Sequence, residues 1–152
     1  MEFIWGDYCP DYENQVEALF DSDAIKFTGC DEGFRTFCDY WIGEIGPDHF
    51  FSKVICREGH LLGVIALAKL PDGVFTVQEF VISPEYRGKG YGTRVLKELL
   101  QRPNSIIGQE ITVAEAVIFP ENIASQKAFL KAGFIYTGTH PDGDALYYQY
   151  NK

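Results

Sequence analysis

The chain has 152 residues, is 46% hydrophobic and 15% aromatic, and carries a formal net charge of −9. This composition predicts one folded domain over residues 1–152 with a packed core, and it argues against a disordered chain or a broad basic surface for nucleic acid. No apolar run approaches the roughly 18 residues of a membrane span and no signal-like segment begins the chain, so we expect a soluble, cytoplasmic protein without membrane contact.

The first third of the chain predicts a short strand followed by two helices. The strand covers residues 2–5, and the helices cover residues 12–22 and 32–42. Apolar side chains recur at helical spacing in both helices, at Val16, Leu19 and Phe20 in the first and at Phe34, Phe37, Cys38 and Trp41 in the second.

The middle of the chain predicts three consecutive antiparallel strands. β-rich runs cover residues 50–57, 61–70 and 74–82, and turn residues separate them at 58–60 and 71–73.

The last third alternates helices and strands. A helix is predicted over 91–101, where Pro103 ends it, then a strand over 111–119 and a helix over 121–132 with Gly133 as its C-terminal cap. A hairpin of residues 134–137 and 145–150, turning at 141–144, completes a mixed α/β domain around one sheet.

Four cysteines, at 9, 30, 38 and 56, form no Cys-x-x-Cys pair. We therefore expect buried reduced thiols rather than a zinc site or a disulfide framework, and no metal.

Three alternate glycines follow the third strand of the middle region and precede a helix. Gly88, Gly90 and Gly92 let the backbone approach a ligand, and the helix start offers free N–H groups and a positive dipole end. This arrangement predicts a cradle for a pyrophosphate, to which Arg87 and Lys89 add positive charge.

Other phosphate-binding patterns match poorly. The dinucleotide fingerprint requires glycine where Thr93 stands, and the Walker pattern of Gly-Lys-Ser/Thr after four spacers is absent. A loose kinase-like match has no accompanying kinase motifs, and the chain is too short for a kinase.

The turn resembles the acetyl-CoA signature of GNAT N-acetyltransferases, Arg/Gln-x-x-Gly-x-Gly/Ala, through Arg87, Gly90 and Gly92. A second GNAT-like element follows at Asn122, Ser125 and residues 131–134. The resemblance covers roughly residues 50–150 and implies a single-domain GNAT-like α/β fold, with a mixed sheet of about 6–7 strands and about 4 helices. It also implies an acyltransferase that uses acetyl-CoA as co-substrate.

The resemblance assigns cofactor roles to particular residues. Backbone N–H groups of Arg87, Gly88, Lys89, Gly90, Gly92 and Thr93 would hold the pyrophosphate. The strand residues Phe80, Val81 and Ile82 would pair with pantetheine, after a bulge and beside a splayed neighbour. The N–H near Phe80 would stabilise the oxyanion. Asn122 would contact pantetheine with Ser125 beside it, although Asn is also a good helix N-cap. Lys89, Lys127 and Lys131 would meet the adenosine phosphates or remain solvated.

The acceptor ammonium must lose a proton before it attacks. Glu79 is our candidate base, because it lies next to the expected acetyl position and alternates with Phe75, Val77 and Val81 on one strand face. Glu115 is the alternative. Many GNAT enzymes carry a tyrosine acid where this chain has Phe129, so Ser125, Tyr136, Tyr147 or water would protonate the thiolate instead.

Twelve acidic residues but only Lys26 and Arg35 as bases occupy residues 1–50, which form the acceptor side in GNAT enzymes. The negative electrostatic potential of these residues suits a cationic small-molecule amine, of polyamine or aminoglycoside type. The alternative is that the acidic residues only keep the protein soluble. Residues 131–134 with Gly138 and 141–143 resemble the end of some aminoglycoside 6′-acetyltransferases.

Three alternatives to this function remain open: acetylation of a peptide or protein amine, a non-catalytic CoA-binding module, and an α/β domain without a CoA site. The last strand is a candidate edge for a homodimer.

Overall fold

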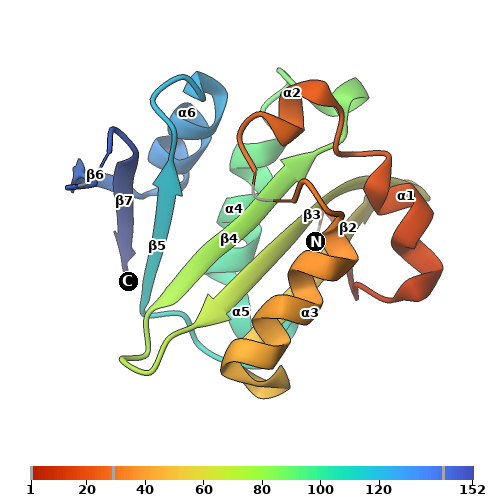
Figure 1. Ribbon diagram of the computed structural model, residues 1–152, viewed down its shortest axis with the longest axis horizontal. Helices are drawn as coiled ribbons and strands as arrows, with labels where there is room; N and C mark the ends of the chain where they lie inside the picture. Colours follow the sequence, from red (N-terminus) through yellow and green to blue (C-terminus); the bar gives the residue numbers. More distant parts are fainter. Residues whose placement is uncertain (1, 29, 142) are drawn as a thin grey trace.

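One mixed sheet runs through the computed structural model, which describes residues 2–28, 30–141 and 143–152. The described residues form seven strands in the order β1-β2-β3-β4-β5-β7-β6 (Figure 1). Their bounds are Ile4–Asp7 (β1), Phe50–Arg57 (β2), His60–Lys69 (β3), Phe75–Ile82 (β4), Val113–Ile118 (β5), Ile135–Thr139 (β6) and Leu146–Asn151 (β7). Neighbours are antiparallel except β4 and β5, which are parallel. The expected mixed sheet of six to seven strands is confirmed.

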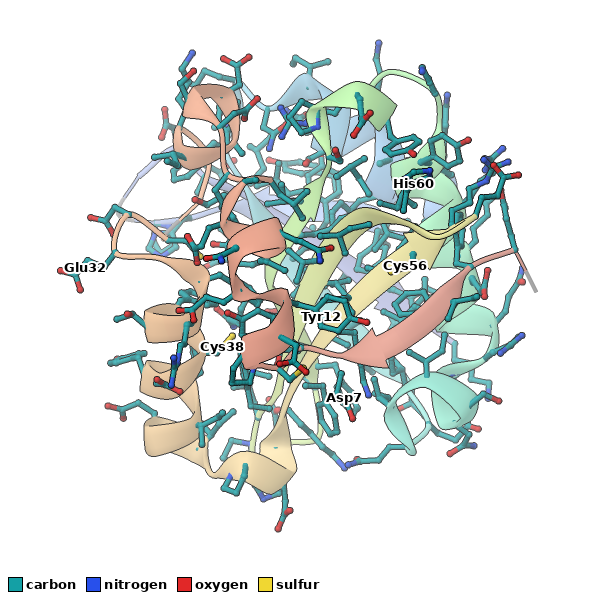
Figure 2. The ribbon with its side chains drawn as sticks, turned by 90° about the vertical axis from the view of Figure 1, so that its right-hand side faces the viewer. Asp7, Tyr12, Glu32, Cys38, Cys56 and His60 are labelled. Carbon is teal, nitrogen blue, oxygen red and sulfur yellow. The ribbon has the colours of Figure 1, made fainter. Side chains whose placement is uncertain are left out.

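Helices cover both faces of this sheet. They are Glu13–Glu17 (α1), Ser22–Ile25 (α2), Phe34–Ile45 (α3), Tyr91–Gln101 (α4), Pro103–Ile107 (α5) and Ile123–Ala132 (α6). In Figure 1, α1 and α3 lie in front of the sheet and α4 lies behind it. Figure 2 shows the Cys38 side chain on the side of α3 that faces the strands, whereas Glu32 points away from the molecule.

The sheet therefore separates two hydrophobic cores. On β3, Ile65 and Leu67 belong to the core under α4 and α5, whereas Val64, Ala66 and Ala68 belong to the core under α1 and α3. Both faces of this central strand are covered, which explains its continuous apolar run. We call these the α4-side core and the α3-side core.

The N-terminal elements depart from the expectation. Strand β1 is displaced by two residues, because its register with β2 runs from Ile4↔Cys56 to Asp7↔Lys53. The helix expected over 12–22 ends at Glu17 (α1), and α2 is an additional helix that begins where the expected one should end: the Asp21 side chain accepts a hydrogen bond from Ala24 N at 2.9 Å and caps it. The apolar residues predicted for the first helix still reach the α3-side core.

Two C-terminal expectations also change. Pro103 ends α4 but also opens the short helix α5, where proline is tolerated in the first turn. The additional short helices α2 and α5 account for six α-helices in the described residues instead of about four. Gly133 caps α6 at φ 109°, as predicted. The predicted turn residue Asp142 lies outside the described residues.

The last strand cannot serve as the edge that we expected for a second subunit. Strand β7 pairs with β5 on one side and with β6 on the other. The outer strand at this end of the sheet is β6, so any second copy joining the sheet here would have to pair with β6.

Among the helices that the described residues form, none is long and apolar enough to cross a bilayer. All four cysteines are free thiols, of which Cys30 and Cys38 are buried.

Candidate active site

Strands β4 and β5 separate where the site lies. Their parallel register runs from Phe75↔Ala114 to Val77↔Ala116, and the described residues form no pair between them beyond it. Figure 1 shows the two strands meeting at one end and diverging toward the other, where α2 and α6 flank the opening. The splay implied by the resemblance is confirmed.

A β-bulge in β4 lies at the start of this opening. Val77 pairs with Leu67 and Glu79 pairs with Ala66, so Gln78 is the additional residue of the bulge. The bulge reverses the alternation of side chains along the strand. Phe75 belongs to the α4-side core, whereas Val81 belongs to the α3-side core. The expectation that Glu79 shares a face with Phe75 and Val77 is therefore wrong, because strict period-2 alternation cannot anticipate a bulge.

A cavity of about 810 Å³ occupies the opening. Its walls are β4, the glycine turn, the end of β5, α6 and the segment around α2. The predicted site residues that line it are Glu79, Phe80, Val81, Ile82, Arg87, Gly88, Gly90, Gly92, Thr93, Asn122 and Ser125. The fold thus brings nearly all of the predicted constellation to one hollow. We call it the central cavity.

Two of the three alternate glycines of the turn adopt positive φ, whereas Gly92 lies within α4. Gly88 and Gly90 adopt φ of 74° and 83°, and a Cβ at either position would meet no atom within 4 Å. Gly90 is the N-cap of α4, and no described side chain caps that helix. The first-turn N–H groups of α4 have no acceptor within the helix, so they suit a pyrophosphate.

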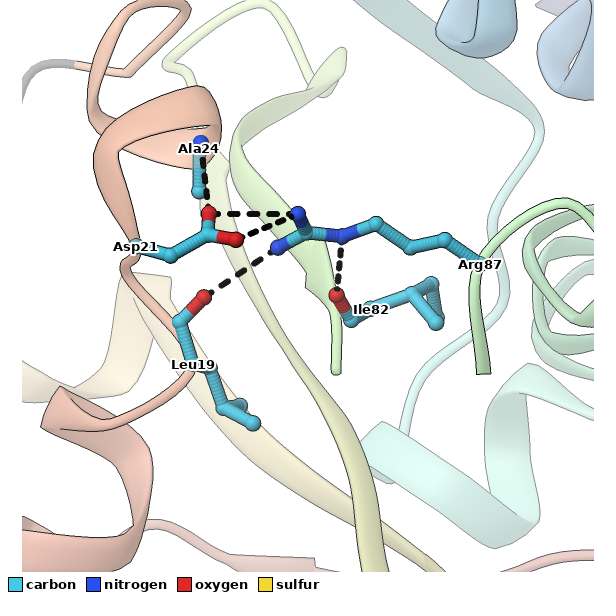
Figure 3. A network of polar contacts seen from close by, with 5 residues as sticks. All are labelled: Leu19, Asp21, Ala24, Ile82 and Arg87. Carbon is cyan, nitrogen blue, oxygen red and sulfur yellow. Dashed lines mark hydrogen bonds and ion pairs between the residues drawn. The ribbon is translucent and has the colours of Figure 1, made fainter. Parts of the chain in front are cut away.

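Arg87 has a different role from the one expected for its charge. Its Nη1 contacts both carboxylate oxygens of Asp21 at 3.1 and 3.0 Å, its Nε donates to Ile82 O at 2.8 Å, and its Nη2 donates to Leu19 O at 3.2 Å (Figure 3). Asp21 in turn caps α2. The Ala24 N–H and the Arg87 guanidinium together lower the pKa of Asp21. The guanidinium therefore fastens the glycine turn to β4 and α2, and its charge is already paired.

The three candidate lysines differ in position. Lys127 and Lys131 line the central cavity from α6. Lys89 is not part of the lining, and its Nζ donates to Glu85 O at 3.2 Å. We therefore regard α6 as the main source of side-chain positive charge at the cavity.

Asn122 is an N-cap and a cavity residue at once. Its Oδ1 accepts a hydrogen bond from Ser125 N at 3.2 Å, and both residues line the cavity. The capping alternative is thus observed, and it leaves the amide nitrogen for a ligand.

Phe129 cannot donate a proton and is firmly packed. It is 3% exposed and makes edge-to-face contacts with Phe80 and Phe134, with ring centroids 6.1 and 4.9 Å apart. Among the substitute donors, Ser125 lines the cavity, whereas Tyr136 and Tyr147 are not in its lining.

The two candidate bases are clearly distinguished. Glu79 is 6% exposed and lines the cavity, and its charge contributes, after burial, to raising the pKa of the Cys30 thiol. Glu115 accepts from Gln149 Nε2 at 3.3 Å and does not line the cavity. The geometry favours Glu79.

Sequence reasoning missed the α2 side of the cavity. Asp23, Ala24, Phe27 and Thr28 line it, as does the bulge residue Gln78. The sequence Asp21-Ser22-Asp23 is a recognisable N-cap signal and would have revealed a separate helix here. Among the described acids of residues 2–50, Asp23 is the one in the lining; Asp21 pairs with Arg87, and Glu17 accepts from Phe34 N at 2.8 Å.

A profile of the acetyltransferase (GNAT) family matches residues 7–134. The chain belongs to this family. It is therefore an N-acetyltransferase that takes its acetyl group from acetyl-CoA, and the sequence-based assignment is confirmed. A relative, the uncharacterized N-acetyltransferase YfmK of Bacillus subtilis (strain 168), is 27% identical over 108 residues, which cover 71% of this chain and 70% of YfmK.

Solved structures of other GNAT enzymes share the fold. The aminoglycoside acetyltransferase AAC(6')-Ib in complex with paromomycin and acetyl-CoA superposes with a TM-score of 0.76 at 18% identity, covering 100% of this chain and 94% of that one. A chimera of the spermidine N-acetyltransferase SpeG from Vibrio cholerae and hSSAT gives 0.80 at 13% identity, covering 99% and 96%. At such identities the likeness shows the fold alone.

Proposed function

We propose that this GNAT enzyme acetylates a primary amine of a small cationic molecule and that Glu79 is its general base. The observation that carries the proposal is the position of Glu79. Its carboxylate is buried at the bulge of β4, where the strand leaves β5 and the central cavity begins. A base must lie within reach of the proton that it accepts, and Glu79 is one of the residues that line the cavity.

We assign the cofactor to the same cavity. The N–H groups from Gly88 to Thr93 would hold the pyrophosphate, and Phe80 to Ile82 would pair with pantetheine where β5 has diverged. Asn122 and Ser125 would contact pantetheine from α6, with Lys127 and Lys131 toward the adenosine phosphates. Bound acetyl-CoA supplies an activated acetyl thioester. The open backbone of the turn and the uncapped helix start support this assignment.

In the proposed reaction, Glu79 takes a proton from the acceptor ammonium, directly or through one water. The backbone N–H near Phe80, freed on the side from which β5 has separated, donates to the acetyl oxygen. Ser125 or water returns a proton to the leaving sulfur, because Phe129 has no proton to give. A thiolate leaves readily since thiol pKa values lie near 8.5.

The residues that line the cavity indicate which kind of amine it can accept. Asp23 and Glu79 are acids of the lining, and Phe27, Val117 and Phe119 add apolar surface. Val117 and Phe119 are 55% and 46% exposed, so an acceptor can cover them. We expect a molecule with one or two ammonium groups on a partly apolar body. The aminoglycoside and spermidine enzymes among the structural relatives support a cationic amine.

We place the reaction in the cytoplasm. Free thiols at all four cysteines are typical of a reducing compartment.

Three measurements test the proposal. Calorimetry with acetyl-CoA, and NAD as the control, tests the cofactor site; an amine panel with thiol detection then tests turnover. Cationic amines should give higher kcat/KM than neutral amines at low salt, with the difference shrinking at high salt. Equal rates at both salt concentrations would refute the charge argument, and binding without any accepted amine would favour a CoA-binding module.

The base is tested by substitution. Glu79→Gln should lower kcat/KM by about 100-fold or more while leaving acetyl-CoA affinity within about twofold of wild type. Glu115→Gln, which removes a carboxylate outside the cavity, is the matched control and should stay near wild type. Full kcat/KM in Glu79→Gln at every pH would show that Glu79 is not the base.

A further inference from the structure

The β-bulge places a neutral amide beside the proposed base. Gln78 is the additional residue of the bulge and the first residue of β4 beyond its last pair with β5, Val77↔Ala116. It is half-buried and lines the central cavity. The reaction proposed above uses Glu79 and leaves the amide of the preceding residue without a role.

Gln78 and Glu79 lie on the same face of β4. Residues paired directly across an antiparallel ladder have their side chains on one face of the sheet. Glu79 pairs with Ala66. Thr76 pairs with Ala68, and both alanines belong to the α3-side core. The Gln78 amide donates to the Thr76 hydroxyl, so it lies on that face as well. The bulge therefore sets an amide and a carboxylate side by side where the strand borders the cavity.

Hydrogen bonds fix which end of the amide is left for a ligand. The Thr76 hydroxyl donates its single hydrogen to Ala68 O at 3.2 Å. It can therefore only accept from Gln78, whose Nε2 lies 2.6 Å from Thr76 Oγ1. The opposite orientation of the amide would bring its oxygen against an oxygen that has no hydrogen to give. Among the residues that the structure describes, none donates to Gln78 Oε1, so this carbonyl oxygen is available as an acceptor.

We propose that Gln78 binds the reacting nitrogen of the acceptor: its Oε1 accepts a hydrogen bond from one N–H of the primary ammonium, beside the carboxylate that removes another proton. The inference rests on the proposed function, in which a primary amine is acetylated in the central cavity. The amide oxygen cannot take the proton itself, so it binds the nitrogen without competing with the base.

This hydrogen bond orients the nucleophile. A primary ammonium has three N–H groups, and after Glu79 has taken one proton the nitrogen has two N–H groups and a lone pair. A hydrogen bond from one remaining N–H to Gln78 Oε1 limits rotation of the amine and directs the lone pair toward the thioester carbonyl. Thr76 is then a positioning residue, because its hydroxyl holds the amide in the orientation that leaves Oε1 for the amine.

The experiment measures kcat and KM for wild type, Gln78→Met, Thr76→Val, their double variant and Gln149→Met, with Tm and acetyl-CoA affinity for each. Spermidine, kanamycin and n-butylamine are tried as acceptors, and the most active one serves for all variants. Gln78→Met keeps the length of the side chain but removes the carbonyl oxygen. It should lower kcat/KM about tenfold or more, mainly through KM, because a hydrogen bond to the charged nitrogen is made in the bound substrate as well as during attack. Acetyl-CoA affinity should stay within about twofold of wild type.

Two further variants separate the binding role from packing. Thr76→Val removes the hydroxyl with little change of shape, so it should lower kcat/KM about threefold, and it should have no further effect once Gln78 is Met, since the amide that it orients is absent. Gln149→Met is the matched control. The Gln149 amide also donates to a side chain, Glu115 Oε2, but it lies outside the cavity lining, so the kinetics should stay at the wild-type level.

A wild-type KM in Gln78→Met would overturn the inference, and so would an equal rise of KM in Gln149→Met. If Gln78→Met does not fold, Gln78→Ala removes the same oxygen without the risk of overpacking and takes its place. The wild type separates the two proposals. If it accepts none of the three amines, the proposed function fails and this inference fails with it. If it is active while Gln78→Met keeps the wild-type KM, the inference alone fails.

Discussion

Replacement of Arg87 by alanine tests whether this signature residue holds the fold or the phosphates. The structure predicts a loss of stability, because the guanidinium donates to Ile82 O, Leu19 O and the Asp21 carboxylate (Figure 3). These contacts join the glycine turn, β4 and the cap of α2. Without them, the segment that lines the acceptor side and the turn that should hold the pyrophosphate lose their common anchor.

The magnitude follows from the contacts. The two main-chain carbonyls each lose a charge-assisted donor, at about 1 kcal/mol apiece. The ion pair with Asp21 is about one third exposed on both sides, so solvent screening limits its contribution to about 0.5–1 kcal/mol. The total is about 2.5–3 kcal/mol, which corresponds to a fall in Tm of about 5–10 °C for a domain of this size.

The assay is thermal unfolding combined with acetyl-CoA titration at several salt concentrations. Arg87→Lys should lose most of the same stability, because an ammonium cannot reproduce the forked contacts. Asp21→Asn and the double variant Arg87→Ala/Asp21→Asn complete a double-mutant cycle. The coupling energy between the two residues should be about 1 kcal/mol. Arg35→Ala is the control, since Arg35 forms a more exposed ion pair with Glu13 and should cost under about 1 kcal/mol.

A specific pattern would refute the reasoning. If Arg87→Ala kept the wild-type Tm but bound acetyl-CoA more weakly and with a smaller salt dependence, the guanidinium would be contacting phosphate. The structure predicts the opposite, because Asp21 already pairs the charge. Binding should weaken in this variant without a change in its salt dependence.

Further outcomes follow from single positions. Gly63→Ala should destabilise by about 1–3 kcal/mol in thermal unfolding, because its Cβ would lie 2.5 Å from Val81 O at the end of β4; an unchanged Tm would contradict that packing. Gly90→Ala should cost about 1–2 kcal/mol and raise the acetyl-CoA Kd, since φ of 83° disfavours a side chain. Asn122→Asp should keep the α6 cap and the Tm but weaken acetyl-CoA binding in calorimetry; unaltered binding would leave Asn122 with capping alone. The stability advantage of wild type over Asp21→Asn should be full at pH well above 3.8 and disappear as pH falls below it. The folded-state pKa of Asp21 is depressed, so protonation in acid removes the interaction; an advantage that persists in acid would contradict this.

The sequence by itself determined the features that depend on local chemistry. The strand at 50–57 and the helix at 91–101 have the predicted bounds, because the spacing of apolar residues that distinguishes strand from helix is set within a few neighbouring residues. The glycine turn was predicted as a close-approach backbone before a helix, and Gly88 and Gly90 adopt the positive φ that glycine permits there. These same residues led to acetyl-CoA and to the GNAT family, which the family profile confirms.

Tertiary structure alone decided the features that depend on partners distant in sequence. The family resemblance implied a bulge in this strand, but its place at Gln78 is set by pairing with β3, and it turns Glu79 to the opposite face from the one that alternation predicted. Arg87 pairs with Asp21, 66 positions earlier. The sequence predicted that its positive charge would face phosphate, whereas the structure uses it to hold the glycine turn in place. Cys30 shares the α3-side core with Val81 of β4 only because the α2–α3 connection packs against the sheet. A pattern in sequence records which residues are compatible with an element, whereas packing selects the partner of each side chain, and the proposed chemistry depends on those partners.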